Sequence, residues 1–319
     1  MKFRTEIKVP PPPFRLSHRD KILLAGSCFT EHIGAYLREH WFDAMVNPFG
    51  TLYNPMSVER LLERSIRREY FTEDELFRHE NTLKSFDLPS RFNRPESGEY
   101  LRHANRTLDH IAAFLRQATT VILTYGTAQL WILRDTNRPV VNCHKQPTAR
   151  FRKHLAAIDE LERAMHHTVD MLNRHRPGIR IVFTLSPVRY LQDGFTSNAR
   201  SKARLLEAML RTTEAFPENT YYFPAYEIFM DDLRDYRFYA ADLKHPGEQG
   251  IAYVREIFDA TFFDEPVRRL NKEISALRKR LLHRPLAPGA THTKTAPESK
   301  SRIEEFLKKH PFLKPDLNF

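Results

Sequence analysis

Residues 21–32 read KILLAGSCFTEH, an apolar run that ends at Gly26 and continues through Ser27 and Cys28 into a helix-like stretch. A buried strand, a glycine turn and a helix start in this order predict a nucleophile held at the carboxyl edge of a sheet. The dipole of the following helix favours an anion at the same point. Far downstream, ADLKHPGEQG (241–250) places Asp242 three residues before His245. Such a pair can supply a base and the group that orients it, so the two segments together predict acyl-transfer chemistry.

The rest of the chain predicts an α/β fold. Apolar runs that read as strands lie at 21–26, 43–46, 121–125, 179–185 and 220–223. Long helical stretches separate them, at 57–68, 102–118, 154–175 and 199–215. Strands spaced by helices indicate a parallel sheet covered on both faces. Segment 70–100 is polar and aromatic with two prolines, and we expect an irregular insertion there that covers the site.

Both motifs resemble the SGNH or GDSL hydrolase superfamily, and more closely its GSCFA-domain branch, whose signature here reads GSCFT (26–30). The resemblance extends from residue 1 to about 262. It implies a three-layer α/β/α, flavodoxin-like fold and chemistry on an acyl ester or thioester. The further segments that carry it are NPFGTLYNP (47–55), YGTAQLW (125–131), NCHKQP (142–147), SPVRY (186–190), YFPAYEI (222–228) and DYRFYAADLKHP (235–246).

The register of the first motif selects the nucleophile. The superfamily's G-D-S block, laid over Gly26, Ser27 and Cys28, gives Cys28 the nucleophile position and Ser27 that of the Asp. A thiol at a helix N-terminus beside a histidine is expected to have a lowered pKa. A one-residue shift of the turn would make Ser27 the nucleophile instead. Cys28 as a buried small residue is the structural alternative.

The resemblance also implies the base and the oxyanion hole. Asp242, His245 and Pro246 match the superfamily's D-x-x-H-P pattern. The oxyanion donors would be the N–H groups of Cys28 and Gly50 and an Asn side chain in a third block. That block reads GTAQ (126–129), so an alanine replaces the Asn. Removing one such donor costs on the order of 3 kcal/mol of transition-state stabilisation. The substitute donors that we expect nearby are Gly126, Thr127, Gln129 and Asn142.

Three further residues are candidates for substrate binding. The apolar stretch IRIVFTL places Ser186 and Arg189 at the carboxyl end of a strand, where open α/β sheets bind ligands. Arg189 could clamp a carboxylate or phosphate, or form a structural salt bridge. His144 follows Cys143 in NCHKQP and is the third candidate. Two adjacent ligands without a second spaced pair do not make a zinc site, so we expect no metal and no cofactor.

Composition limits the remaining choices. The net charge is +10, but residues 266–319 hold thirteen Lys and Arg against five Asp and Glu, which leaves the body near neutral at +2. The tail lacks a basic face with stacking aromatics, so nucleic-acid binding is not expected. No apolar run is long enough for a membrane span, and the N-terminus lacks a signal-peptide core. Two cysteines and a nucleophilic thiol favour the cytoplasm.

The chain changes character after residue 262, which predicts a domain over 1–262 and a basic helical tail over 263–319. Val267, Leu270, Ile274, Leu277 and Leu281 form an apolar stripe with spacings of 3 and 4. A linker is expected over about 284–300, followed by a short helix that Ser301 and Glu304 open as a capping box. The stripe favours packing on the body of the protein, with a homodimer through this helix as the alternative. We expect the tail to be a separable appendage.

Two functions follow as hypotheses. The first is an SGNH-type hydrolase or acyltransferase for a small-molecule or carbohydrate acyl substrate, with Cys28, His245 and Asp242 as its catalytic residues. The second is a binding module that kept the fold and lost efficient chemistry, which the alanine at 128 would permit.

Overall fold

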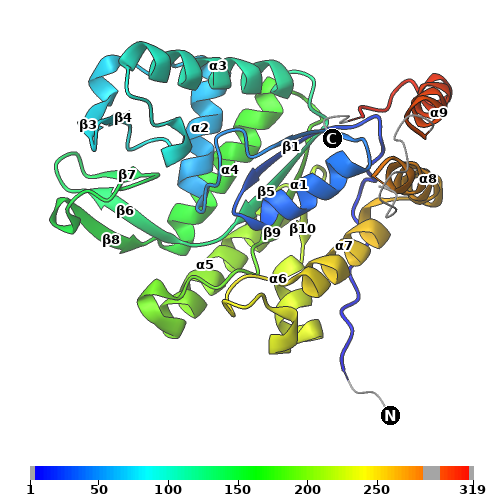
Figure 1. Cartoon of the computed structure of the whole chain (residues 1–319). Helices are drawn as coiled ribbons and strands as arrows, with labels where there is room; N and C mark the ends of the chain where they lie inside the picture. Colours follow the sequence, from blue (N-terminus) through cyan, green and yellow to red (C-terminus); the bar gives the residue numbers. More distant parts are fainter. Residues whose placement is uncertain (1–3, 283–294, 316–319) are drawn as a thin grey trace.

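A computed structural model describes residues 4–282 and 295–315 of the chain. Its centre is a five-stranded parallel sheet with the order β10-β9-β5-β1-β2 (Figure 1). Counted along the chain, this is the flavodoxin order 2-1-3-4-5. The strands are β1 (Lys21–Gly26), β2 (Asp43–Val46), β5 (Thr120–Tyr125), β9 (Arg180–Leu185) and β10 (Thr220–Phe223). The predicted parallel sheet and its five strands are therefore confirmed.

Helices cover both faces of the sheet, which gives the predicted three layers (Figure 1). One face packs against α2 (Pro55–Arg67), α3 (Ser97–Leu115), α4 (Ile158–His175) and α5 (Gly194–Ala215). The other packs against α1 (Phe29–Glu39) and α7 (Glu248–Phe262). Because every residue of β5 is buried, the central strand has the continuous apolar run of a sheet covered twice.

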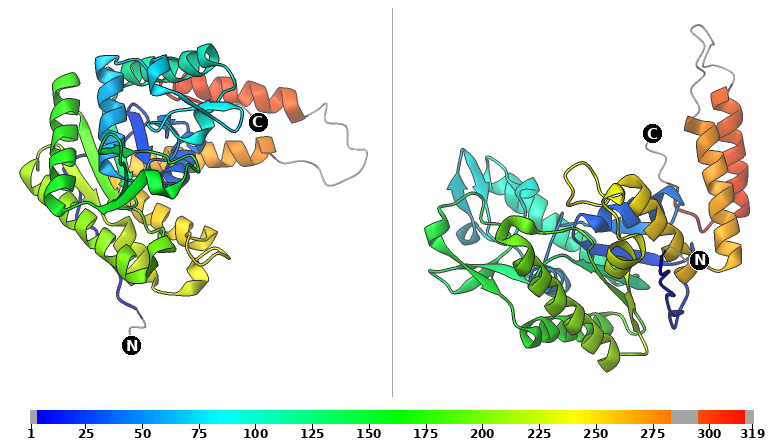
Figure 2. Two further views of the ribbon diagram at one scale, coloured as in Figure 1. Left: turned by 90° about the vertical axis from the view of Figure 1, so that its left-hand side faces the viewer. Right: turned by 90° about the horizontal axis from the view of Figure 1, so that it is seen from below.

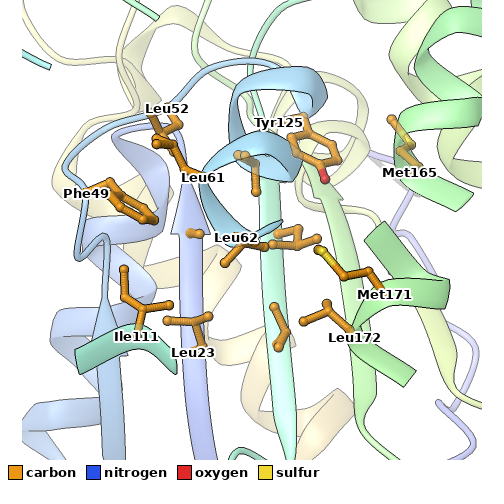
Figure 3. Packing of buried hydrophobic residues seen from close by; sticks show 14 of the residues in the cluster. Leu23, Phe49, Leu52, Leu61, Leu62, Ile111, Tyr125, Met165, Met171 and Leu172 are labelled. Atoms are coloured by element: carbon orange, nitrogen blue, oxygen red, sulfur yellow. The ribbon is translucent and has the colours of Figure 1, made fainter. Parts of the chain in front are cut away.

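The larger core lies under α2, α3, α4 and α5. Figure 3 shows Leu61 and Leu62 of α2 lying over the strands beside Tyr125 and Leu23. These side chains are at most 1% exposed. Burying a leucine of this kind contributes about 1.5–3 kcal/mol. This core holds the strands that carry the candidate site at their carboxyl ends.

A second sheet was not predicted. Residues 129–155 form three antiparallel strands in the order β7-β6-β8, and the predicted helix over 154–175 begins only at Ile158. The strands are β6 (Gln129–Leu133), β7 (Arg138–Val140) and β8 (Phe151–Leu155). The sequence FRKHL of β8 has only one fully buried residue, so its apolar signal is weak.

The insertion over 70–100 is mostly irregular, as expected. It contains η1 (Glu73–Glu75), the hairpin strands β3 (Phe77–His79) and β4 (Thr82–Lys84), and η2 (Ser90–Phe92). A turn η3 (Thr148–Arg150) precedes β8, and η4 (Leu191–Asp193) precedes α5. After β10, the chain forms α6 (Ala225–Glu227), η5 (Ile228–Leu233) and η6 (Tyr236–Phe238) before α7.

The tail folds back onto the protein. Helices α8 (Glu265–Leu282) and α9 (Thr295–Lys309) lie side by side (Figure 2). Together they cover Trp41, which is fully buried against Ile274, Ile303 and Leu313. The N–H of Lys314 also donates to the Trp41 carbonyl oxygen at 3.0 Å. The apolar stripe is therefore occupied within one chain, which argues against a separable appendage and against a homodimer through this surface.

The details of the tail differ from the prediction. Helix α9 begins at Thr295, six residues before the predicted capping box, so the end of the expected linker is helical. Residues 283–294 of the linker and the side chain of Leu281 lie outside the described part of the chain. None of the helices in that described part combines the length and hydropathy that a membrane span requires.

Packing of the tail predicts a stability effect. Ile274→Ala should lower the free energy of unfolding by about 2–5 kcal/mol, because it opens a cavity beside Trp41. Urea unfolding measures this change, with exposed Lys272→Ala on the same helix expected within about 0.5 kcal/mol of wild type. If Ile274→Ala also left stability unchanged, the tail would be independent of the body after all.

Candidate functional site

The turn between β1 and α1 depends on a close approach of two backbones at Gly26. Its φ is +143°, and a Cβ at this position would lie 2.1 Å from the Thr124 carbonyl oxygen. Only glycine avoids that clash. The next N–H, of Ser27, donates to the same carbonyl at 2.9 Å. The chain then turns into α1, with Cys28 at the N-cap position.

Ser27 and Cys28 have different environments. Ser27 is fully buried, and its Oγ has no hydrogen-bond partner. It lies beside the phenol of Tyr190, whose hydroxyl is also buried. Cys28 is partly exposed, and its side chain makes no capping hydrogen bond to the helix. Of the two, Cys28 is the more accessible to a substrate.

Burial raises the pKa of the Cys28 thiol, in contrast to the lowered pKa that the sequence predicts. The backbone N–H groups of Cys28 and Phe29 and the ammonium of Lys202 oppose this change, but desolvation outweighs them. The prediction counted the helix N-terminus and omitted burial. Cys143, the second cysteine, has its pKa raised to about 11 by burial alone.

Lys202 is an ionisable neighbour that sequence reasoning missed. It projects from α5, is 2% exposed, and its Nζ donates to the Ser186 carbonyl oxygen at 2.5 Å. The same Nζ lies 5.2 Å from the ring centre of Tyr190. Burial lowers the pKa of Lys202 to about 7, and the nearby thiol of Cys28 opposes that shift. In the sequence, Lys202 is followed by the ordinary helical segment LLEAML (205–210), which gives no indication of a functional site.

Asp242 and His245 form the predicted pair. The Nδ1 of His245 lies 2.6 Å from Oδ2 of Asp242 in the loop between η6 and α7. The other carboxylate oxygen accepts the N–H groups of Lys244 and His245 at 2.9 and 3.0 Å. These hydrogen bonds, with that of the His245 N–H largest, hold the pKa of Asp242 well below its usual range. The carboxylate thus stays ionised and orients the ring.

The loop that carries His245 is held by Arg189. Its guanidinium donates to the Leu243 carbonyl oxygen and lies 4.4 Å from the ring centre of Tyr239. The main-chain N–H of Arg189 also donates to the Lys244 carbonyl oxygen, at 3.1 Å. Arg189 lines the cavity described below, yet it is engaged with this loop rather than with a carboxylate. We therefore assign it a positioning role as well as a place in the predicted site.

The remaining predicted substrate residues do not reach the cavity. Ser186 is fully buried, with its carbonyl oxygen bound to Lys202. His144 is 4% exposed, and its Nε2 lies 2.8 Å from the carbonyl oxygen of Ser85 and 3.1 Å from that of Leu88. The ring therefore holds the insertion against its neighbouring loop. Neither residue enters the function proposed below.

Most of the predicted oxyanion donors are already engaged. Gly50 N–H donates to the Asn47 carbonyl oxygen at 2.7 Å. The N–H groups of Gly126 and Thr127 both donate to the Tyr53 carbonyl oxygen, at 2.8 and 3.0 Å. Side-chain donors are also occupied, since Asn142 Nδ2 donates to Ser90, Gln129 Nε2 to Ser197, and Thr127 Oγ1 pairs with Ser201. Within the described residues, the N–H groups of Cys28 and Phe29 remain without a backbone acceptor.

Asn47 organises the turn through its side chain, a role that the sequence analysis does not predict. Its Oδ1 accepts the N–H of Gly26 at 2.9 Å, and its Nδ2 donates to Glu31 at 2.6 Å. One amide thus joins the end of β1 to the first turn of α1. A signal was available, because Asn47 opens the NPFG segment that the family resemblance had already selected.

A cavity of about 1120 Å³ opens beside this turn. Glu31, Gly50, Tyr53, Tyr190 and His245 are among the residues that line it, and the second sheet and the 70–100 insertion contribute its outer wall. Cys28 is not among the lining residues, and no hydrogen bond joins its sulfur to His245 in the described structure. The structure thus brings both candidates to one edge of the sheet without direct contact between them.

The described residues contain no group of three or more His, Cys, Asp or Glu placed to hold a metal ion.

Comparisons with known proteins identify the family of this chain. The profile of the GSCFA family matches residues 21–258, about three quarters of the chain. No curated protein matches the sequence. Among solved structures, an acetyl xylan esterase (Est2A) from the rumen bacterium Butyrivibrio proteoclasticus is 13% identical, with a TM-score of 0.25. That match covers 51% of this chain and 37% of the esterase chain, too slight a likeness to inform function.

The buried ammonium predicts a pH-dependent change in stability. An unfolded lysine has a pKa of about 10.4, so a folded pKa of about 7 destabilises the protein most below pH 7 and least near pH 10. Lys202→Met removes this penalty. The unfolding free energy of the variant minus that of the wild type should therefore be roughly 3 kcal/mol smaller at pH 10 than at pH 7.

Urea unfolding at the two pH values measures that difference. Exposed Lys279→Met is the control and should show no such trend. A pH-independent difference for Lys202→Met would mean that the buried lysine titrates like an exposed one.

Proposed function

Because this chain belongs to the GSCFA family, we propose that it is an SGNH-type hydrolase of an acyl ester or thioester, with Cys28 as nucleophile. The observation that carries the proposal is the Asp242–His245 pair, joined at 2.6 Å and placed at a cavity that the first turn of α1 also lines. This arrangement supplies a base, its orienting carboxylate and a thiol at one sheet edge.

The raised pKa of Cys28 defines how the thiol would react. A thiol that rests in its neutral form needs its proton removed as the sulfur attacks, as a serine does. His245 would accept that proton on Nε2, while Asp242 stabilises the imidazolium that forms. The loop that Arg189 holds would have to bring His245 into contact with the sulfur once substrate is bound. Catalytic hydrogen bonds of this kind are often long in empty enzymes.

The acyl group would then pass through two balanced steps. Sulfur attack on the carbonyl carbon forms a tetrahedral oxyanion, which the N–H groups of Cys28 and Phe29, neither of which has a backbone acceptor, would stabilise. His245 gives its proton to the leaving alcohol or thiol as the old ester bond breaks. Water, deprotonated by His245, next attacks the acyl-enzyme and releases the acid and the thiol. An acceptor alcohol or amine in place of water would make the protein an acyltransferase.

A binding module is the second candidate, and the occupied donors favour it. The N–H groups of Gly50, Gly126 and Thr127 already donate to carbonyl oxygens within the protein. Ala128 supplies no side-chain donor. A small acylated or carbohydrate ligand could bind in the cavity without turnover. For either function we propose the cytoplasm as the site of action, since both cysteines are free thiols.

Replacement of the base separates these functions. His245→Ala should reduce saturable hydrolysis of p-nitrophenyl acetate by more than tenfold, because general base catalysis contributes about 10²–10⁴. Intact-mass measurement should detect an acetyl adduct on the wild type, and Cys28→Ala should abolish it. Thermal unfolding should show that both variants remain folded.

His154→Ala is the matched control, because His154 is also paired with a carboxylate, that of Glu160 at 2.9 Å, but lies outside the cavity lining. It should keep the wild-type rate. Wild-type turnover in His245→Ala would remove this histidine from the mechanism. An adduct mapped to Ser27 would transfer the nucleophile by one residue, and no turnover by the wild type would favour the binding module.

A further inference from the structure

We infer that the acyl substrate carries an anionic group, a phosphate or a carboxylate, that binds to unpaired cations in the wall of the cavity. The inference rests on the proposed function, because it specifies the substrate of the same site. It is independent of which residue is the nucleophile.

Cations outnumber carboxylates in the lining of the cavity. Glu31 and Asp193 are its acidic residues, and both already have partners: Glu31 accepts from Asn47, and Asp193 is paired with Lys153. After that pairing, four cationic side chains and one carboxylate remain. The four are Arg91, Lys145, Arg189 and Lys244.

None of these four forms a salt bridge within the described residues. In the same wall, Lys153 does form one, with Asp193. Arg91 donates only to the Asn47 carbonyl oxygen, at 3.3 Å. Arg189 is bound to its loop as described above. Lys145 and Lys244 have no side-chain hydrogen bond in the described structure. The lining of the cavity therefore keeps an excess of cationic side chains that form no salt bridge.

This excess is local. Residues 1–265 carry a net charge of only +2, because 37 Lys and Arg are nearly balanced by 35 Asp and Glu in that part of the chain. A concave wall with net positive charge and low-dielectric sides concentrates field and attracts anions. Arginine also matches phosphate and carboxylate oxygens with two parallel donors.

Arg91 is placed to bind an anion close to the reacting group. Its side chain lies against Gly50, where a Cβ would come within 2.8 Å of Arg91 Cδ. The φ of Gly50 is +86°, a conformation that suits glycine. The NPFG turn thus leaves room for this arginine beside the β1–α1 turn. Lys145, from the NCHKQP loop, lines the same cavity.

The full-length protein offers its own reporter for the test. Trp131 lines the cavity, and the second tryptophan, Trp41, is fully buried beneath α8 and α9. Tryptophan fluorescence should therefore report on ligands in the cavity. Titration with inorganic phosphate or acetate should change the signal saturably, whereas acetamide, a neutral analogue, should not. Arg91→Gln and Lys145→Ala should each raise the dissociation constant of the anion that binds by at least fivefold. The exposed variant Lys272→Ala should bind it as the wild type does.

Turnover then identifies the substrate class. Three acetyl thioesters differ in the group at the far end of the thiol: that of 2-mercaptoethanol is neutral, that of 3-mercaptopropionate carries a carboxylate, and that of 2-mercaptoethyl phosphate carries a phosphate. We expect kcat/KM at least tenfold higher for one of the anionic thioesters, with the preference reduced in Arg91→Gln. The preferred anion distinguishes a carboxylate from a phosphate.

The two proposals fail in different ways. Equal turnover of all three thioesters would overturn the anionic substrate and leave the hydrolase intact. If neither these thioesters nor p-nitrophenyl acetate is turned over, the hydrolase fails, and the fluorescence titration alone decides the anion site. Absence of phosphate and acetate binding to the wild type would overturn that site.

Discussion

The contact between Gly26 and the Thr124 carbonyl oxygen is the constraint on which the candidate site depends. With no side chain at position 26, β1 can end against β5 and turn at once into α1. That turn fixes Cys28 at the helix N-terminus and buries Ser27. Asn47, in the loop that follows β2, hydrogen-bonds to both Gly26 and Glu31. The loop after β2 is therefore attached to this turn. The proposed nucleophile, the N–H groups proposed as oxyanion donors and one cavity wall all depend on this single backbone approach.

The parts of the fold that could be predicted are those with strong local signals. β1, β5 and β9 are buried on both faces, and their continuous apolar runs reveal them without tertiary information. The β6–β8 sheet could not be found this way, because Phe151–Leu155 mixes basic and apolar residues and gains its strand pairing from β6. Pairing partners distant in sequence are invisible to a periodicity argument.

The site shows the same division. The Asp242–His245 pair could be predicted because its two members are only three positions apart, and this spacing alone permits the hydrogen bond. Lys202 could not, since its significance arises only when α5 packs against the sheet and removes its ammonium from water. The direction of the Cys28 pKa was wrong for a related reason. Helix dipoles can be read from sequence, whereas the desolvation that outweighs them depends on packing.

The burial of Trp41 has a consequence for the order in which the chain becomes structured. Its partners at positions 274, 303 and 313 are more than 230 residues away, near the end of the chain. During synthesis, the ribosome would release the whole α/β body before this indole finds its cover. Contacts between segments so distant in sequence form late and slowly. An apolar surface just after α1 would thus be open to chaperones, or to a second nascent chain, until the residues that cover it, up to Leu313, have been synthesised.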